Sequence, residues 1–166
     1  MVLELDSHGF PKTSGIFETI KTLNGQPIAL ARHMRRALDS ARSLGLKMPP
    51  EEELRVDLIK ILNERPFEVG KLRICIYADG FHLSHDEYTE PTSPLRFTFF
   101  SQTVLGEEHK QFPYDHRFEL LKSAQDEGFD DCILFNVKNE VTESAVANLL
   151  FLIQGTWVTP PISAGV

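Results

Sequence analysis

Residues 15–30 read Gly-Ile-Phe-Glu-Thr-Ile-Lys-Thr-Leu-Asn-Gly-Gln-Pro-Ile-Ala-Leu, and this stretch decides the fold. Its first nine residues are rich in β-branched and aromatic side chains, which favour a strand. Asn24-Gly25 is the dipeptide most typical of a tight hairpin turn, so the chain should fold back over residues 27–30. The sequence therefore begins with a predicted β-hairpin.

From Leu30 onward the apolar residues follow a helical period. They recur three or four positions apart, at Leu30, Met34, Ala37, Leu38, Ala41 and Leu44. Gly45 is a typical residue to end such a helix. Residues 51–62 repeat the pattern after Pro49-Pro50, with acidic residues in the first turn that suit the helix dipole. Two helices are expected to follow the hairpin.

The rest of the first half predicts a sheet. Residues 71–77 are apolar and β-prone, and apolar and polar residues alternate over residues 95–103. Between them, residues 85–94 are acidic and contain two prolines, which predicts a surface loop. We expect a first domain over residues 1–104.

The second half is shorter. Residues 105–113 fit neither period and predict a connection between domains. A third helix over residues 115–127 should bury its apolar side chains, Phe118, Leu121 and Ala124. Short strands are expected at residues 132–135, 141–146 and 149–153. The expected second domain covers residues 114–166, and the predicted fold class is α+β.

Composition excludes several classes of function. Among 166 residues, 24 are acidic and 17 basic, and the net charge of −7 argues against nucleic acid as a partner. No run approaches the roughly 20 apolar residues of a membrane span. Residues 1–10 lack the basic start and apolar stretch of a signal peptide. Cys75 and Cys132 lie in apolar runs, which predicts buried thiols and a cytoplasmic protein.

Four side chains could carry chemistry, and each has a simpler interpretation. Arg36 is either a solvated arginine or an anion-binding fork. Lys110 is a surface charge, unless a desolvated pocket makes it a nucleophile. Glu143 is an exposed strand residue, or a buried carboxylate that needs a partner. His33 is interpreted as a hydrogen-bonded packing residue. No glycine-rich phosphate loop, zinc spacing or nucleophile elbow is present, and we predict no metal site.

Eight segments together form a more specific pattern. In chain order they are Gly15-Ile16-Phe17-Glu18-Thr19-Ile20, Gly25-Gln26-Pro27, His33-Met34-Arg35-Arg36, Leu72-Arg73-Ile74, Lys110, Gly128-Phe129-Asp130-Asp131-Cys132-Ile133-Leu134, Val141-Thr142-Glu143 with Asn148-Leu149, and Thr159-Pro160-Pro161. In these segments the chain resembles the class IV (fold type IV) aminotransferases. That family depends on pyridoxal 5′-phosphate and includes branched-chain and D-amino-acid aminotransferases and 4-amino-4-deoxychorismate lyase. The resemblance implies a two-domain D-amino-acid-aminotransferase-like fold.

The resemblance also implies a role for each matched residue. Lys110 would form the Schiff base with the cofactor aldehyde and then shuttle a proton. Glu143 would pair with the pyridine nitrogen and keep it protonated. Arg36 would hold the phosphate, and Asn148 would lie near the cofactor and support the backbone. Arg73 would receive a substrate carboxylate.

In the family, the T-P-P turn is soon followed by a G-[IV]-T-R segment that completes the phosphate site. The sequence ends at Val166, before that segment, so we expect an incomplete second domain and weakened cofactor binding. The resemblance implies a homodimeric enzyme that moves an amino group between an amino acid and a 2-oxo acid. One alternative is 4-amino-4-deoxychorismate lyase, which forms p-aminobenzoate and pyruvate. A second is a non-catalytic, shortened family member that acts through association.

Overall fold

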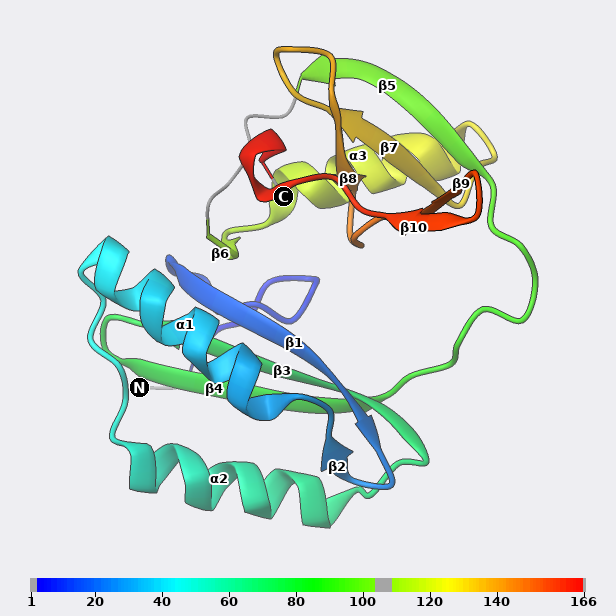
Figure 1. Ribbon diagram of the computed structural model, residues 1–166. Coiled ribbons are helices and arrows are strands. Elements are labelled where there is room, and N and C mark those ends of the chain that lie inside the picture. The colour runs from blue at the N-terminus through cyan, green and yellow to red at the C-terminus, as the bar shows by residue number, and fades with distance from the viewer. Residues whose placement is uncertain (1–2, 104–108, 166) are drawn as a thin grey trace. The chain divides into compact units, whose positions relative to one another are not determined.

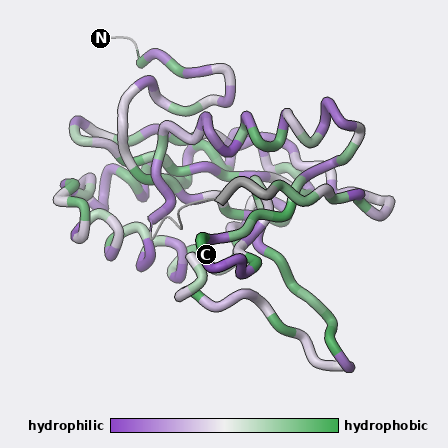
Figure 2. The backbone as a smooth tube through the Cα atoms, turned by 90° about the horizontal axis from the view of Figure 1, so that it is seen from above, coloured by the Kyte–Doolittle hydropathy of each residue, from purple (hydrophilic) through white to green (hydrophobic). Residues whose placement is uncertain are grey.

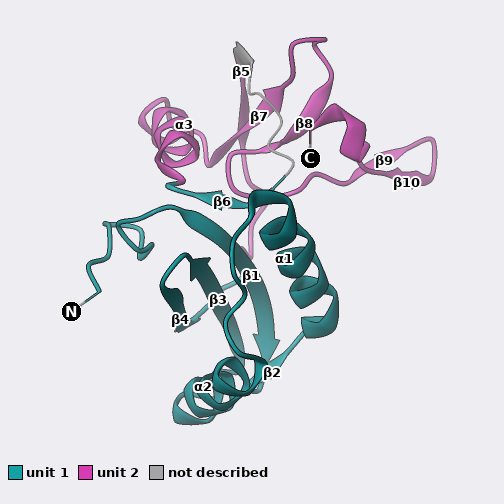
Figure 3. Cartoon of the chain, turned by 90° about the vertical axis from the view of Figure 1, so that its left-hand side faces the viewer, with its two compact units in different colours: residues 1–90, 109–113 teal, residues 91–108, 114–166 magenta. Residues whose placement is uncertain are grey.

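The computed structural model describes residues 3–103 and 109–165, with the backbone alone for residues 101–103. The chain folds into two compact units (Figure 3). Unit 1 contains residues 1–90 and 109–113, and unit 2 contains residues 91–108 and 114–166.

Unit 1 is built on an antiparallel sheet with the strand order β2-β1-β3-β4 (Figure 1). β1 (Gly15–Leu23) pairs along its whole length with β3 (Val69–Tyr77), and β4 (Gly80–Glu87) extends the sheet beyond β3. A short strand, β6 (Gln111–Phe112), pairs with the start of β1. β1 therefore has a paired strand on each side, with β3 on one edge and β2 and β6 on the other.

The predicted hairpin is confirmed. β2 (Gln26–Pro27) pairs with the end of β1 after a two-residue turn. Asn24 and Gly25 have φ angles of 48° and 75°, the left-handed conformation that asparagine and glycine tolerate best. Two such residues in succession are the requirement of a type I′ turn, whose twist matches that of the strands.

The two helices that follow are also confirmed. α1 (Leu30–Leu44) ends at Gly45, which has a φ of 67°, and α2 (Glu51–Glu64) begins directly after Pro50. Apolar residues recur every three or four positions along both helices. Figure 2 shows that hydrophobic and hydrophilic residues are interspersed along the chain. The apolar sides pack on one face of the sheet and form the core of unit 1: Ile16, Ile20, Ala37, Ala41, Leu54, Leu58, Leu72, Ile74 and Ile76.

The predicted loop over residues 85–94 is wrong at its start, because β4 continues to Glu87. His85 lies opposite Leu72 of β3 and is only 5% exposed. Its Nε2 is 2.8 Å from Oγ1 of Thr22. Strand pairing and this buried hydrogen bond therefore extend the strand into a segment that composition alone marks as solvated.

Unit 2 contains a three-stranded sheet in the order β5-β7-β8. β5 (Phe97–Thr103) runs parallel to β7 (Asp131–Phe135), and α3 (Asp115–Asp126) lies between them in the chain, as a parallel pair requires. β8 (Val141–Ser144) is antiparallel to β7. The core is formed by Leu120, Ala124, Cys132, Leu134 and Ala145.

The buried face of α3 differs from the predicted one. The buried residues are Arg117, Leu120 and Ala124, whereas Phe118 and Leu121 are half-buried. The helix is thus rotated relative to the expected apolar stripe, because its first turn contributes an arginine to the interior.

The end of the chain forms a separate two-stranded hairpin of β9 (Phe151–Ile153) and β10 (Thr156–Val158). A short 3-10 turn, η1 (Ile162–Ala164), follows it. Much of the hairpin's large apolar surface is exposed, at Leu152, Ile153, Trp157 and Val158. Exposed apolar side chains on a free hairpin are a typical site of association.

The chain passes from unit 1 to unit 2 after residue 90, whereas the expected domain boundary is at residue 104. β5 belongs to unit 2 because its partner is β7, and residues 109–113 belong to unit 1 because β6 pairs with β1. Within the expected connection over residues 105–113, residues 105–108 lie outside the described part of the chain.

The two cysteines are buried as free thiols, as predicted, with one in each unit. Burial raises the pKa of Cys75 to about 12 and that of Cys132 to about 11. Among the described residues, no helix is long and apolar enough to cross a membrane.

Candidate functional site

A charged cluster in unit 1 joins two of the matched segments. Glu18 of β1 is buried, and its carboxylate accepts hydrogen bonds from Nε (2.6 Å) and Nη2 of Arg36 on α1. Nδ1 of His33 lies 2.7 Å from the same carboxylate. A buried carboxylate requires such partners, and the pairing explains why the F-E-T strand and the H-M-R-R helix belong together.

In this cluster, Arg36 and His33 both contact the carboxylate of Glu18. His33 is the hydrogen-bonded packing residue expected from the sequence. The hydrogen bond to Glu18 raises the pKa of Arg36 above its usual value, against partial burial, which lowers it. The Arg36 side chain is 49% exposed. Because Glu18 takes the Nε–Nη2 edge of the guanidinium, an added anion would meet the end formed by Nη1 and Nη2.

Lys110 is held beside β1 by the backbone. Its carbonyl oxygen accepts a hydrogen bond from the amide of Phe17 (2.8 Å), directly before the two residues of β6. The residue is half-buried, and its Nζ lies 4.8 Å from the centre of the Phe17 ring. Lys110 is therefore not the fully solvated surface charge of the simpler interpretation.

The aromatic residue that follows Lys110 also has a structural reason. Phe112 is 2% exposed, and its ring packs against Phe10, which in turn packs against Phe17; we call these three rings the aromatic cluster. Gly15 permits this arrangement, because a Cβ there would lie only 2.7 Å from the Phe112 ring. Phe112 thus anchors the short strand that follows Lys110 in unit 1.

Arg73 projects from β3 toward the N-terminal residues. Its guanidinium carbon lies 4.1 Å from the centre of the Phe10 ring, and Nη1 donates a hydrogen bond to the carbonyl of His8 (2.6 Å). Burial lowers the pKa of Arg73, although nearby Asp86 and Asp6 act in the opposite direction. Its Nε is buried and has no hydrogen-bond partner among the described residues. Arg73 therefore keeps hydrogen-bonding capacity that the surrounding protein does not use.

In unit 2, Glu143 of β8 is paired with an arginine that sequence reasoning missed. Nη2 of Arg117 on α3 donates to its Oε1 at 2.5 Å. The side chains are 4% exposed for Arg117 and 18% for Glu143. One available signal was the spacing, because Arg117 precedes Leu120 by three positions and Ala124 by seven, on the same helical face. Glu143 is thus a largely buried carboxylate with a charged partner.

Asn148 lies in the turn after β8 and is exposed. In the described part of the chain we find no hydrogen bond to its side chain. Ser144 holds this turn instead, since its Oγ accepts hydrogen bonds from the amides of Ala147 (2.9 Å) and Val146 (3.4 Å). Ser144 thus supports the backbone of this turn, and the role of Asn148 near a cofactor stays a prediction.

Asp131 ties the start of β7 to the end of β8. It is 6% exposed, and its Oδ1 accepts hydrogen bonds from the amides of Cys132 (2.7 Å) and Ala145 (3.1 Å). Asp131, the second aspartate of the matched G-x-D-D segment, therefore stabilises the fold of unit 2. No group of three or more His, Cys, Asp or Glu side chains within residues 3–103 and 109–165 is arranged to hold a metal ion.

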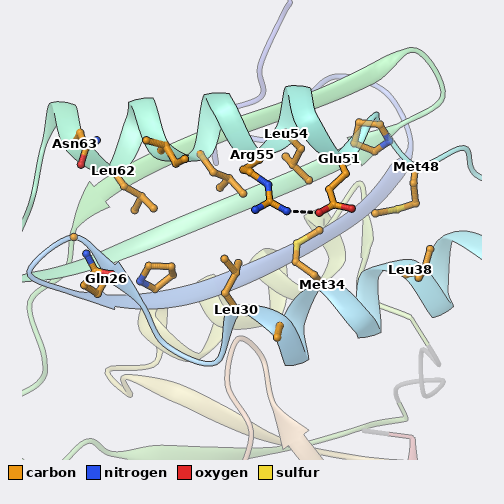
Figure 4. Close-up of a pocket in the computed structure, with 16 residues that line it drawn as sticks. Gln26, Leu30, Met34, Leu38, Met48, Glu51, Leu54, Arg55, Leu62 and Asn63 are labelled. Atoms are coloured by element: carbon orange, nitrogen blue, oxygen red, sulfur yellow. Dashed lines mark hydrogen bonds and ion pairs between the residues drawn. The ribbon is translucent and has the colours of Figure 1, made fainter.

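A separate groove of about 730 Å³ lies in unit 1 between β2, α1 and α2 (Figure 4). Apolar side chains dominate it, with Leu30 and Met34 on α1 facing Leu54 and Leu62 on α2. The predicted site residues do not line it. The apolar stripes of α1 and α2 were the sequence signal for this groove. They were interpreted as core residues, so the groove was not predicted.

Comparison with known proteins gives the family. The model of the family "Amino-transferase class IV" matches residues 15–166. Two curated relatives, each named "Probable branched-chain-amino-acid aminotransferase", come from Rickettsia felis and Rickettsia bellii. Each is 21% identical to this chain, and the match covers 93% of this chain and 61% of the relative. The chain thus spans about three fifths of the length of these relatives.

Solved structures agree in fold. A "Putative 4-amino-4-deoxychorismate lyase" from Legionella pneumophila is 22% identical and has a TM-score of 0.80 over 92% of this chain and 63% of its own. The branched-chain aminotransferase of Thermoproteus uzoniensis is 21% identical, with a TM-score of 0.79 over 92% of this chain and 60% of its own. The expected fold is therefore confirmed over the part that this chain contains. The family match over residues 15–166 shows that the chain belongs to the class IV aminotransferases.

Proposed function

We propose that this chain binds pyridoxal 5′-phosphate through Lys110 and takes part in transferring an amino group between an amino acid and a 2-oxo acid. The observation that carries the proposal is the setting of Lys110, which is half-buried beside the Phe17 ring and fixed to β1 by a backbone hydrogen bond. A lysine held in a fixed, partly buried position presents its amine to a bound aldehyde in one geometry, which a freely moving surface lysine does not.

The chemistry of the described side chains fits the polar groups of this cofactor. An amine suits its aldehyde, a carboxylate suits its pyridine nitrogen, and a guanidinium suits its phosphate. Lys110, Glu143 and Arg36 supply these three groups. When bound, the cofactor withdraws electrons from the α-carbon of an amino acid, which lets the α-proton leave.

The surroundings of these residues are compatible with the roles that the resemblance implies. In this proposal Lys110 would hold the aldehyde carbon through its amine, with loss of water, and its free amine would carry the α-proton once the amino group of the substrate has displaced it. Glu143 accepts a hydrogen bond from the pyridine N–H, and the Arg117 pair keeps its carboxylate in one orientation. Arg36 offers the phosphate the guanidinium edge that Glu18 leaves open. Arg73 would receive the carboxylate of the substrate through its guanidinium.

Binding is tested by spectroscopy. We expect the purified chain with added cofactor to gain a visible absorption band that borohydride removes, and mass spectrometry should locate the reduced adduct on Lys110. Lys110→Ala should lose the band, whereas Lys71→Ala, a matched lysine change on β3, should keep it. A chain that stays colourless at saturating cofactor would overturn the proposal and favour a non-catalytic role.

The phosphate role of Arg36 has its own test, since Arg36 also stabilises Glu18. We expect Arg36→Gln to weaken binding of pyridoxal 5′-phosphate while leaving the affinity for pyridoxal, which lacks the phosphate, nearly unchanged. An equal loss for both ligands would mean that the substitution acts through the fold of unit 1.

The type of reaction is tested by its products. We propose transamination, so an amino acid and a 2-oxo acid should exchange their amino group. Release of pyruvate and p-aminobenzoate from 4-amino-4-deoxychorismate would identify a lyase instead. We further propose a homodimer, supported by the exposed apolar residues of the β9–β10 hairpin. Light scattering after size exclusion should give twice the 18.8 kDa chain mass, and a monomer would contradict it.

A further inference from the structure

The residues before β1 form a folded turn that lies outside the family match over residues 15–166. Leu5 pairs with Pro11 as an isolated antiparallel bridge. Oδ1 of Asp6 accepts hydrogen bonds from the amides of His8 (2.8 Å) and Phe10 (2.9 Å). We call residues 4–12 the N-terminal turn. These contacts fix the backbone at Phe10, and so determine where its ring lies.

Phe10 is the buried residue of this turn, at 1% exposure. Its ring meets Phe17 edge-on, with the centroids 4.9 Å apart and an interplanar angle of 77°. It also meets Phe112, with centroids 5.7 Å apart. On β3, Arg73 places its guanidinium 4.1 Å from the Phe10 ring centre. Phe10 is therefore the element of the N-terminal turn that connects it to the rest of unit 1.

Both of the aromatic partners of Phe10 also adjoin Lys110. Phe17 donates its amide to the Lys110 carbonyl, and its ring lies under the Lys110 ammonium. Phe112 is two residues further along the chain and holds β6 in the sheet. We propose that Phe10 is a positioning residue for Lys110, which acts by fixing the Phe17 ring and the strand that carries the lysine. Its importance for catalysis rests on the proposed function.

The physical consequence concerns the reactivity of the Lys110 amine. The face of an aromatic ring stabilises an ammonium ion, and this stabilisation requires the ring to stay under the charge. If Phe10 is removed, the Phe17 ring and β6 lose a packing surface, and the ammonium loses its fixed position. The amine should then react faster with an acylating reagent, by about two- to fivefold, the ratio that a typical cation–π contact implies.

The experiment compares Phe10→Ala and Phe10→Leu with the wild-type chain and with Phe67→Ala. Phe67 is a matched control, because its ring packs against His85 elsewhere in unit 1. Each chain is acetylated briefly with an N-hydroxysuccinimide ester at several pH values. Mass spectrometry then measures the modification of Lys110 relative to Lys122 of unit 2. We expect a two- to fivefold rise for both Phe10 variants and none for Phe67→Ala.

Hydrogen exchange gives a second measurement. The amide of Phe17, which donates to Lys110, should exchange faster in both Phe10 variants than in Phe67→Ala. If Phe10→Ala is unfolded by circular dichroism, Phe10→Leu decides the question, because it keeps an apolar side chain and loses only the ring. Equal Lys110 labelling in Phe10→Leu and Phe67→Ala would overturn the proposal. The labelling uses no cofactor, so a failure of cofactor binding would reject the proposed function and leave this comparison valid.

Discussion

The ion pair between Arg117 and Glu143 gives the sharpest prediction about stability. Arg117→Met removes the guanidinium and keeps a long apolar side chain on α3. Glu143 would then be left as a carboxylate that is only 18% exposed and lacks its partner. Breaking a buried pair in this way costs about 3–5 kcal/mol. Because water reaches Glu143 in part, we expect a loss near the lower end, about 3 kcal/mol.

The same helix provides a control. Lys122 and Asp126 of α3 form an ion pair whose side chains are 73% and 65% exposed. Exposed pairs contribute little, so Lys122→Met should cost less than about 0.5 kcal/mol. The comparison separates the effect of burial from the loss of a positive charge on α3.

A double variant tests the mechanism itself. If the cost of Arg117→Met comes from the unpaired carboxylate of Glu143, then adding Glu143→Gln should recover about 1–2 kcal/mol. The assay is urea unfolding followed by circular dichroism, with hydrogen exchange of α3 and β8 amides to assign the change to unit 2. The reasoning is refuted if Arg117→Met costs no more than Lys122→Met, or if the losses of the two single variants simply add.

Further predictions concern the interior of both units. Burial raises the pKa of Cys75 to about 12 and of Cys132 to about 11, so neither thiol should react with a disulfide reagent at pH 8 until urea unfolds the chain. Rapid native reaction of either thiol would contradict this burial. Gly15→Ala should cost about 3 kcal/mol in thermal or chemical unfolding, because its Cβ would lie 2.1 Å from the carbonyl oxygen of Ile76 and 2.7 Å from the Phe112 ring. Gly128→Ala faces open space at a φ of 86° and should cost only about 1 kcal/mol, so equal losses would rule out the clash.

Much of the fold could be predicted from the sequence because its signals are local. The turn at Asn24 and Gly25 and the end of α1 at Gly45 depend on φ preferences of single residues. Helix and strand periods are likewise set by neighbours a few positions apart. The family assignment also came from short segments in order, and the family match confirmed it.

Other features were decided only by the tertiary structure. His85 was predicted to lie in a loop, yet it is buried against Thr22, 63 positions earlier in the chain. The buried face of α3 was misplaced because Arg117 finds its partner, Glu143, 26 positions later. A charged or polar residue is predicted to be solvated when no partner for it is known from the sequence. The partners of His85 and Arg117 lie in distant elements, so neither burial could be predicted.

The sequence by itself therefore determined the first hairpin, the three helices and the family. It did not determine the boundary between the units, because β5 and β6 are assigned by their strand partners. Nor did it show that Arg36 already holds Glu18, or that Phe10 packs beside the strand of Lys110. Periodicity records which face of an element is buried, whereas the environment of a charge or ring depends on side chains that only folding brings into contact.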